Sequence, residues 1–522
     1  MPEHRYEKTY LIKKFDRILG HTLEEIDQIG FFNRIQAYAL QKGVAGSLIE
    51  QSVLGYDADS KQEADLIVVD GNKEIKTELK TTGMVIADSP TSHYVAKEPM
   101  SITAVGVYDI ANQVFETSHF WEKLEHMLIV YYHYAANHPV EAFGYRLFPI
   151  KGYEFHEFTD IEIQALRSDW ENVRALVADI VAKHTGPHDK AWKEAVKEEY
   201  IERHGVLRRM LNYIDLAPKF PPRFRLKKPI VSSMISKHFG YELEQLPGRY
   251  VTVTDIDKKC HELTEKYSGK TIGELAKEFG FSVVSENGID KKGVAEKIVI
   301  SMFGGTSSRM NQIDLFERFG LIAKSIVVSS KGKRTEDMKL FHVDFEEVVR
   351  TEIEQDGEIR PISFEDSDLY LYFADHEFLC VLFQEPEDNL VNVGGKMINA
   401  KPNSLSANRF VGFKRLVFSD EFIDGPVRKL WQDLREKILN QKLVDVISYD
   451  KNGIPKINKS GDISSAPNFM KSKENEVFLR GSGTDSSLVH KTECVNGIKM
   501  LPQYVWIKGT AVVEELNNID EI

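Results

Sequence analysis

The chain has 522 residues, which is more than one compact core usually holds, so two or more domains are expected. Its 42% hydrophobic and 28% charged residues are typical of a globular protein, and no apolar run approaches the length that crosses a bilayer. The formal net charge of −13 argues mildly against non-specific binding to polyanions, although a local basic patch is compatible with it.

The N-terminal stretch MPEHRYEKTYLIKKFDRILG is charged throughout and lacks the apolar core of a signal peptide. Three scattered cysteines without Cys-x-x-Cys spacing favour neither a disulfide framework nor a zinc site. These features predict a protein of the reducing cytoplasm that does not act at a membrane.

The first segment with candidate chemistry is KGVAGSLIEQSVLG, which begins at Lys42. Its apolar residues recur at helical spacing and form a stripe, with Glu50 beside it. Glu50 is therefore either a solvated residue at the edge of the stripe or an acid that reaches into a site between this helix and a sheet.

The next segment, ADLIVVDGNKEIKTELK, predicts a β-hairpin, because two β-rich runs flank the turn signal DGNK. With a four-residue loop at DGNK, Val69 pairs with Glu74. Counting outward from this pair places Asp65 opposite Glu78. Opposed residues of antiparallel strands point to the same face, and Lys80, two residues beyond Glu78, shares that face. The hairpin therefore brings two carboxylates and an ammonium group together.

Two adjacent carboxylates repel each other, and the pKa of each rises unless a cation lies between them. Mg²⁺ prefers oxygen ligands and commonly binds one or two carboxylates together with the phosphate oxygens of a substrate. It can polarise a phosphate and lower the pKa of an attacking water, while a nearby lysine neutralises the developing charge. The hairpin thus indicates a Mg²⁺ site that acts on a phosphate, the alternative being a salt-bridged face worth little energy.

A later stretch, KFPPRFRLKKP, groups five basic residues without an acid. Its candidate DNA contacts are Arg223, Arg225, Lys227 and Lys228. The stretch is interpreted either as a solvated basic loop or as a strand that contacts phosphates.

Five pairs of similar segments occur in the same order along the chain. Their offset stays near 250 residues at first and widens to about 280 at the end, as expected when loops lengthen. The pairs are LGHTLEEI with SGKTIGELA, KGVAGSLIEQSVLG with KGVAEKIVISMFGG, FETSHFWEKLEHMLIV with FEDSDLYLYFADHEFLCVL, LRSDWENVRALV with VRKLWQDLREKI, and PPRFRLKKPIV with PQYVWIKGTAV. They predict a tandem duplication with domains at 1–245 and 250–522, each of mixed α/β or α+β class.

The second copy keeps the framework of the first but replaces its acids. The expected equivalents are Asp314 for Asp65, Lys324 for Lys80, Ile322 for Glu78, Tyr372 for Lys123, and Val299 or Ile300 for Glu50. Because the same scaffold stands without most of these acids, a structural role for them is difficult to argue. The pattern fits one copy that binds metal and one that cannot.

At these residues the first half resembles the MutH family of GATC-specific endonucleases. The matching stretches are KGVAGSLIE, DLIVVDGNKEIKTELKT, FETSHFWEKL and PPRFRLKKPIVSSMISKHF, and the second half ends with the matching LPQYVWIKGTAV. The resemblance implies a restriction-endonuclease-like fold in both copies, with a mixed central sheet flanked by helices. It also implies Mg²⁺-dependent hydrolysis of both strands of double-stranded DNA at GATC, before the G, as in the two-copy type II restriction enzymes of this family.

The resemblance further implies which residues serve the site. Metal-binding or catalytic roles fall on Glu50, Asp65, Glu78 and Lys80, and the lysines lining the site are matched by Lys42 and Lys123. Arg225 stands where the family has a base-reading tyrosine, and the hairpin is longer than the family's. Base recognition and the response to methylation are therefore left open.

The second copy is expected to bind DNA without cutting it, as an effector domain. Its candidate contacts are Arg480, in the expected loop FLRGSGTDSS, and Lys508. The protein is expected to be a monomer in solution or a dimer formed on DNA. The alternatives are a MutH-like nicking nuclease of DNA repair and a DNA-binding regulator without catalysis.

Overall fold

The structure is a computed structural model that describes residues 4–35, 43–56, 64–87, 93–136, 140–216, 220–285, 291, 293–329, 336–353, 359–386, 390–393, 396–399 and 405–519. Its contacts divide the chain into two units. The first comprises Met1–Asp255, Asn311–Gly320 and Thr351–Arg360, and the second comprises Ile256–Met310, Leu321–Arg350 and Pro361–Ile522. The described helices include none that is both long and apolar enough to cross a membrane.

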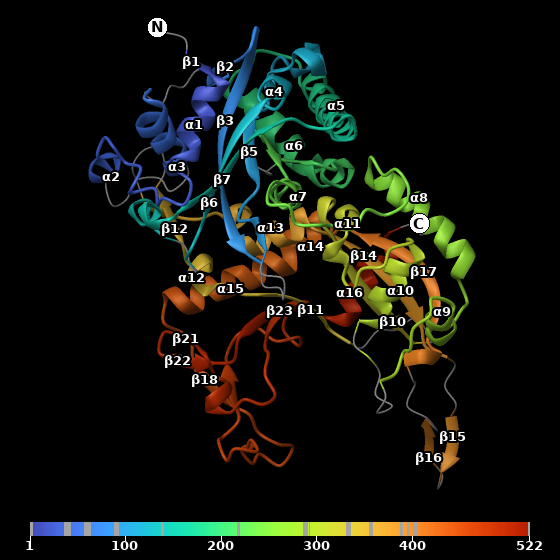
Figure 1. Ribbon diagram of the computed structural model, residues 1–522. Helices are drawn as coiled ribbons and strands as arrows, with labels where there is room; N and C mark the ends of the chain where they lie inside the picture. Colours follow the sequence, from blue (N-terminus) through green and yellow to red (C-terminus); the bar gives the residue numbers. More distant parts are fainter. Residues whose placement is uncertain are drawn as a thin grey trace. The chain divides into compact units, whose positions relative to one another are not determined.

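The first unit is built on a mixed six-stranded sheet in the order β1-β2-β3-β6-β7, with β4 paired to β3 (Figure 1). The pairs β1–β2 and β3–β6 are parallel, whereas β2–β3, β3–β4 and β6–β7 are antiparallel. The strands are β1 (Arg5–Glu7), β2 (Leu66–Asp70), β3 (Lys73–Ile86), β4 (Tyr94–Ala96), β6 (Met127–His133) and β7 (Ile150–His156). The predicted mixed α/β class is confirmed.

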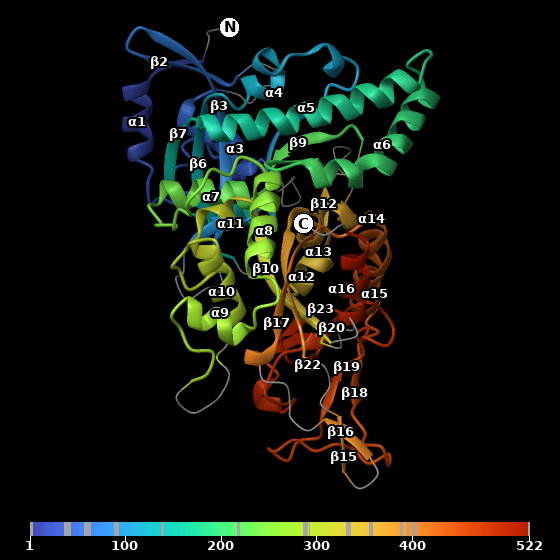
Figure 2. The same cartoon turned by 90° about the vertical axis from the view of Figure 1, so that its right-hand side faces the viewer.

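A second, antiparallel sheet of the first unit consists of β5 (Met100–Ala104), β9 (Arg223–Leu226) and β8 (Ile214–Leu216). The longest helices, α5 and α6, pack against each other (Figure 2). The helices are α1 (Lys8–Asp16), α2 (Phe31–Arg34), α3 (Val44–Leu48), α4 (His119–Glu122), α5 (Asp160–Lys183), α6 (Lys190–Met210), α7 (Lys228–His238) and α11 (Asp314–Arg318).

The β2–β3 hairpin has the predicted register. Val69 pairs with Glu74, and continuation of the ladder beyond the last pair, Leu66 with Thr77, places Asp65 opposite Glu78. The loop is shorter than predicted, because Asp70 pairs with Lys73 and only two residues form the turn. Gly71 has a φ of +64° there, a backbone conformation that a two-residue hairpin turn requires and glycine adopts without strain.

The core of the first unit packs helix α1 and the α3 region against one face of this sheet. Leu11, Leu48, Val68, Leu79 and Leu128 are all buried in it. Burial of apolar side chains on this face contributes about 25 cal/mol per Å² of surface removed from water. It fixes the hairpin, because a slip by one residue would turn every side chain to the other face.

The second unit contains a three-stranded sheet, β10 (Leu321–Val328), β14 (Glu377–Gln384) and β17 (Arg409–Leu416), and another made of β11 (Met338–His342), β23 (Gln503–Ile507) and β20 (Val477–Gly481). Two-stranded ribbons complete its strands: β15 (Leu390–Val393) with β16 (Lys396–Asn399), β18 (Asp445–Ile447) with β19 (Ser465–Pro467), and β21 (Glu493–Val495) with β22 (Ile498–Met500). A further ribbon, β12 (Thr351–Ile353) with β13 (Ile359–Pro361), belongs to the first unit except for Pro361. Its helices are α8 (Val253–Tyr267), which begins just before the unit boundary, α9 (Ile272–Glu278), α10 (Val294–Met302), α12 (Phe345–Val348), α13 (Asp368–Asp375), α14 (Asp420–Phe422), α15 (Arg428–Leu439) and α16 (Gly509–Asn517).

The central strands of the two units have the same order of pairing. In the first unit β3 pairs with β6 in parallel and β6 pairs with β7 antiparallel. In the second unit β10 pairs with β14 in parallel and β14 pairs with β17 antiparallel. Glu78 lies beside Met127 in the first ladder, and Ile322 lies beside Phe378 in the second.

The helix that precedes the second of these strands also begins in the same way in both units. The hydroxyl of Ser118 accepts a hydrogen bond from the backbone of Trp121 at the start of α4. The hydroxyl of Ser367 does the same for Tyr370 at the start of α13. Such N-caps typically contribute about 1 kcal/mol to stability.

The predicted equivalence of Asp314 and Asp65 is wrong. Asp65 directly precedes strand β2, whereas Asp314 begins helix α11 and belongs to the first unit. In the part of the second unit that the structure describes, β10 pairs only with β14, so no hairpin partner corresponds to β2.

Candidate active site

Glu78 is a buried carboxylate held between two lysines. Only 4% of the residue is exposed. Its Oε1 accepts a hydrogen bond of 2.9 Å from Lys80, two residues along β3, and its Oε2 accepts one of 2.7 Å from Lys123. Lys123 follows directly after α4, and strand pairing of β3 with β6 brings the two segments together. Charge-assisted bonds of this kind are strong when water is excluded.

Asp65 lies next to this group at the start of the hairpin. Its Oδ2 accepts a hydrogen bond of 2.9 Å from the backbone N–H of Leu79. Burial and the nearby charge of Glu78 raise the pKa of Asp65 to about 6, against the opposing influence of Lys123 and Lys80. Two carboxylates thus share a site where the second one ionises reluctantly, which a divalent cation would relieve.

Glu50, half-buried, lies in a π-helical turn, Ile49–Leu54, that continues helix α3. Such turns are rare and occur frequently at functional sites. Burial, followed by the charges of Glu50, Asp65 and Glu78, raises the pKa of the Tyr56 hydroxyl. The three predicted acids thus all act electrostatically on the Tyr56 hydroxyl. Lys42 lies outside the described residues.

The chemistry of these side chains fits a hard divalent ion, because Mg²⁺ selects carboxylate oxygens. Within the described ranges, no three acidic, histidine or cysteine side chains are already arranged as a set of metal ligands. Glu78 is instead neutralised by Lys80 and Lys123. Ion binding would therefore require at least one of these ammonium groups to leave the carboxylate.

The basic stretch forms strand β9 and the start of α7, and its four candidates differ in environment. Arg223 is exposed and Lys228 half-buried. Arg225 forms an ion pair with Asp215 of the neighbouring strand β8. Lys227 is only 5% exposed and donates a hydrogen bond of 2.7 Å to the carbonyl oxygen of Leu211. Arg225 and Lys227 thus stabilise the fold, while Arg223 and Lys228 reach the surface.

The two candidates of the second unit are Arg480 and Lys508. Arg480 is on strand β20, so the expectation that it lies in a loop is wrong. Its guanidinium lies 4.6 Å from the ring centroid of Trp506 and pairs with Asp337. Lys508 is half-buried and directly precedes α16.

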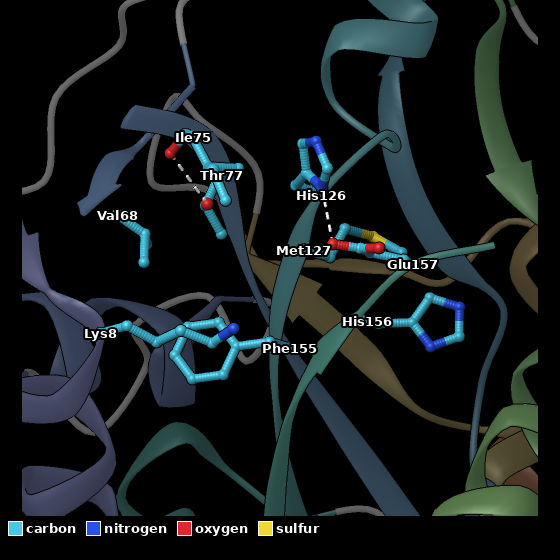
Figure 3. Close-up of a pocket in the computed structure, with 9 residues that line it drawn as sticks. All are labelled: Lys8, Val68, Ile75, Thr77, His126, Met127, Phe155, His156 and Glu157. Atoms are coloured by element: carbon cyan, nitrogen blue, oxygen red, sulfur yellow. Dashed lines mark hydrogen bonds and ion pairs between the residues drawn. The ribbon is translucent and has the colours of Figure 1, made fainter. Parts of the chain in front are cut away.

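The small cavity in Figure 3 lies on the other face of the same hairpin. Its lining includes Ile75 and Thr77 of β3, together with Val68 of β2. These β3 residues alternate with Lys76 and Glu78 along the strand, so their side chains point away from the acids. The cavity is therefore not part of the carboxylate site.

Two residues near the acids were not predicted from the sequence. The ring of Tyr56 stacks on that of His4, with centroids 3.9 Å apart. His4 also donates a hydrogen bond of 3.2 Å to the carbonyl oxygen of Asp65. Neither residue type nor spacing signals this arrangement, because parallel pairing of β1 with β2 brings the N-terminus to the hairpin.

Comparisons with known proteins relate this chain to DNA-cleaving enzymes. The family model described as DNA mismatch repair enzyme MutH matches residues 54–169, a range that contains Asp65, Glu78, Lys80 and Lys123. The type II restriction enzyme Sau3AI of Staphylococcus aureus is 20% identical over 476 residues, which cover 86% of this chain and 90% of that protein. The chain thus carries a MutH-like domain in its first unit and is similar over most of its length to a type II restriction enzyme.

Proposed function

We propose that the protein is a type II restriction endonuclease that hydrolyses both strands of double-stranded DNA with Mg²⁺. The observation that carries the proposal is the buried Glu78 between Lys80 and Lys123, with Asp65 beside it at a raised pKa. A stabilising ion pair needs one cation and gains nothing from a second acid nearby. A site that binds a metal ion and a phosphate uses both carboxylates for the ion and both ammonium groups for the phosphate.

In this proposal Asp65, Glu78 and Glu50 would hold the ion, which would polarise the phosphate and lower the pKa of the attacking water. The protein's own lysines then act on the substrate. Once freed from Glu78, Lys80 and Lys123 neutralise the charge that grows on the phosphate oxygens. Burial of the site strengthens this interaction, because the effective dielectric constant is lower than in water.

The proposed target is GATC with cleavage before the G, which rests on the family motifs of the first half. Arg223 and Lys228 are proposed to contact DNA phosphates near the site, since both reach the surface at β9 and α7. Arg225 supports them from the buried side through its ion pair with Asp215.

We propose that the second unit is a non-cleaving copy of the first that binds DNA as an effector. The common order of strand pairing and the Ser118 and Ser367 caps support a duplication. Ile322, on β10, and Tyr372, on α13, are the proposed counterparts of Glu78 and Lys123. An apolar and an aromatic side chain cannot hold a hard cation.

The remaining lysine of the second copy has a structural role. Lys324 donates a hydrogen bond of 3.0 Å to the carbonyl oxygen of Lys339, and burial lowers its pKa. The ring of Tyr372 lies 4.2 Å from that of Phe341. At these two positions the second unit thus has a hydrogen bond to the backbone and an aromatic contact.

The test compares Glu78→Gln with Glu74→Gln, a matched exposed glutamate on the same strand that pairs with Arg5. Supercoiled plasmid with Mg²⁺ is expected to give linear fragments with GATC ends from the wild type and from Glu74→Gln. Glu78→Gln is expected to lose about 1000-fold or more of the rate while still binding DNA. Cleavage by Glu78→Gln at the wild-type rate would refute the site assignment. Nicked circles alone from the wild type would point to the repair-type alternative.

A further inference from the structure

Tyr56 carries a buried hydroxyl that forms no hydrogen bond with any residue the structure describes. Buried polar groups are normally paired, and leaving one unpaired costs stability. The position of Tyr56 is nevertheless fixed by its neighbours. Its backbone N–H donates to the carbonyl oxygen of Glu50 at 3.1 Å, and its ring stacks on His4. The structure therefore holds an unpaired donor in place.

Tyr56 is joined to the proposed metal site by contacts with two of its segments. Glu50, Asp65 and Glu78 each act on it electrostatically. The His4 ring that supports Tyr56 is itself hydrogen-bonded to the backbone of Asp65. The stack thus connects the π-helical turn that carries Glu50 with the hairpin that carries the other two acids.

The neighbouring Tyr6 differs from Tyr56 in that its hydroxyl has a hydrogen-bond partner. Its hydroxyl donates a hydrogen bond of 3.0 Å to the carbonyl oxygen of Leu54, at the end of the same π-helical turn. Tyr6 and Tyr56 therefore both contact this π-helical turn, but of their two hydroxyls only that of Tyr6 is hydrogen-bonded to its backbone. Packing alone would be served equally well by phenylalanine at position 56.

We propose that Tyr56 is a positioning residue for the ion-binding carboxylates, and that its hydroxyl donates a hydrogen bond to the Glu50 carboxylate when that group turns to hold a divalent cation. The proposal rests on the Mg²⁺-dependent function proposed above. A donor outside the ligand set fixes the orientation of the ligating oxygen, and loss of such a donor typically weakens metal binding 10- to 100-fold.

The test measures ion uptake without DNA and without catalysis. Free Mn²⁺ is counted by electron paramagnetic resonance in titrations of the full-length protein, with Mg²⁺ added as a competitor. Tyr56→Phe is expected to bind the ion about 10- to 100-fold more weakly than the wild type. Because the variant also removes an unpaired buried oxygen, its ion-free Tm is expected to equal or exceed that of the wild type.

Tyr6→Phe is the matched control, since it removes a paired hydroxyl from the same segment. It is expected to lower the Tm and to leave ion affinity unchanged. The proposal is overturned if Tyr56→Phe binds the ion as the wild type does, or if its affinity falls only together with a Tm loss like that of Tyr6→Phe. Wild-type uptake that is abolished by Glu78→Gln, with no effect of Tyr56→Phe, would overturn this inference alone. A wild type that takes up no ion would overturn the proposed metal-dependent function as well.

Discussion

The proposed chemistry of this protein depends on a few charged side chains in a buried site. Glu78 accepts hydrogen bonds from two lysines, and Asp65, a neighbour on the same hairpin, has a raised pKa. Burial, followed by the charge of Glu78, raises the pKa of Asp65, whose carboxylate accepts a hydrogen bond from the backbone of Leu79. It is the residue whose charge a metal ion would stabilise most.

Ion binding is therefore expected to depend on pH through Asp65. Below a pKa of about 6 the carboxyl is protonated, and the ion must displace that proton. Affinity should fall about tenfold per pH unit below 6 and level off above it. Because folding raises the pKa of Asp65 above its usual value, the free energy of unfolding of the ion-free protein falls as the pH rises from that value to about 6. This loss of stability disappears in acid.

Calorimetric titration with Mg²⁺ between pH 5 and 8 checks this expectation. Asp65→Asn should remove both the affinity and its pH dependence. Asp70→Asn, a change on the same strand at an exposed residue paired with Lys8, should keep both. An affinity that stays constant down to pH 5 would contradict a ligand role for Asp65.

Individual elements explain how much of the site could be predicted. The β2–β3 register followed from strand periodicity and a turn signal, which are local, so the opposition of Asp65 and Glu78 was predictable. The π-helical turn at Glu50 and the His4–Tyr56 stack were not, because both depend on packing between distant segments. The spacing of apolar residues along a helix is the same whether or not the helix contains a π-helical turn.

The basic strand shows the same limit. Four closely spaced basic residues were predicted to contact phosphates, but two of them, Arg225 and Lys227, form contacts within the fold. Asp215, which pairs with Arg225, is ten residues away on a strand whose pairing no local pattern fixes. Charge clusters therefore predict a surface only after the buried partners are known.

Strand β9 and helix α7 allow a paired prediction. Arg223→Ala should weaken DNA binding and reduce the slope of log affinity against log salt by about 0.9, as for one lost phosphate contact. Lys227→Ala should instead lower the free energy of unfolding by about 1–3 kcal/mol, because it leaves the buried carbonyl of Leu211 unpaired. Filter binding across salt concentrations and urea unfolding separate the two roles. Equal effects of both variants on the salt slope would contradict the division.

For the whole molecule, we propose a first unit that bears the acids and a second unit whose corresponding positions are apolar or aromatic. The internal sequence repeat predicts this contrast at Ile322 and Tyr372, and Ile322 lies beside Phe378 in the ladder of β10 and β14. The prediction failed at Asp314, because an alignment of short segments cannot distinguish a strand end from a helix start. The order of strand pairing is therefore stronger evidence for a duplication than the match of single residues.

If the second unit binds DNA as an effector, cleavage should respond to the number of sites. A plasmid with two GATC sites is expected to be cut several-fold faster per site than one with a single site. Arg480→Ala should reduce this stimulation and leave one-site cleavage unchanged, because Arg480 lies on a strand of the second unit. Lys258→Ala, at an exposed position of α8, serves as the control. Equal rates on both plasmids would remove the case for an effector.

The central claim, that the hairpin of the first unit gathers its acids around a divalent ion, is tested most directly by anomalous diffraction from crystals containing Mn²⁺. The account predicts a manganese peak in contact with the carboxylates of Asp65 and Glu78, with Lys80 or Lys123 withdrawn from Glu78, and no peak beside Ile322. A peak elsewhere, with Glu78 still bound by both lysines, would contradict it.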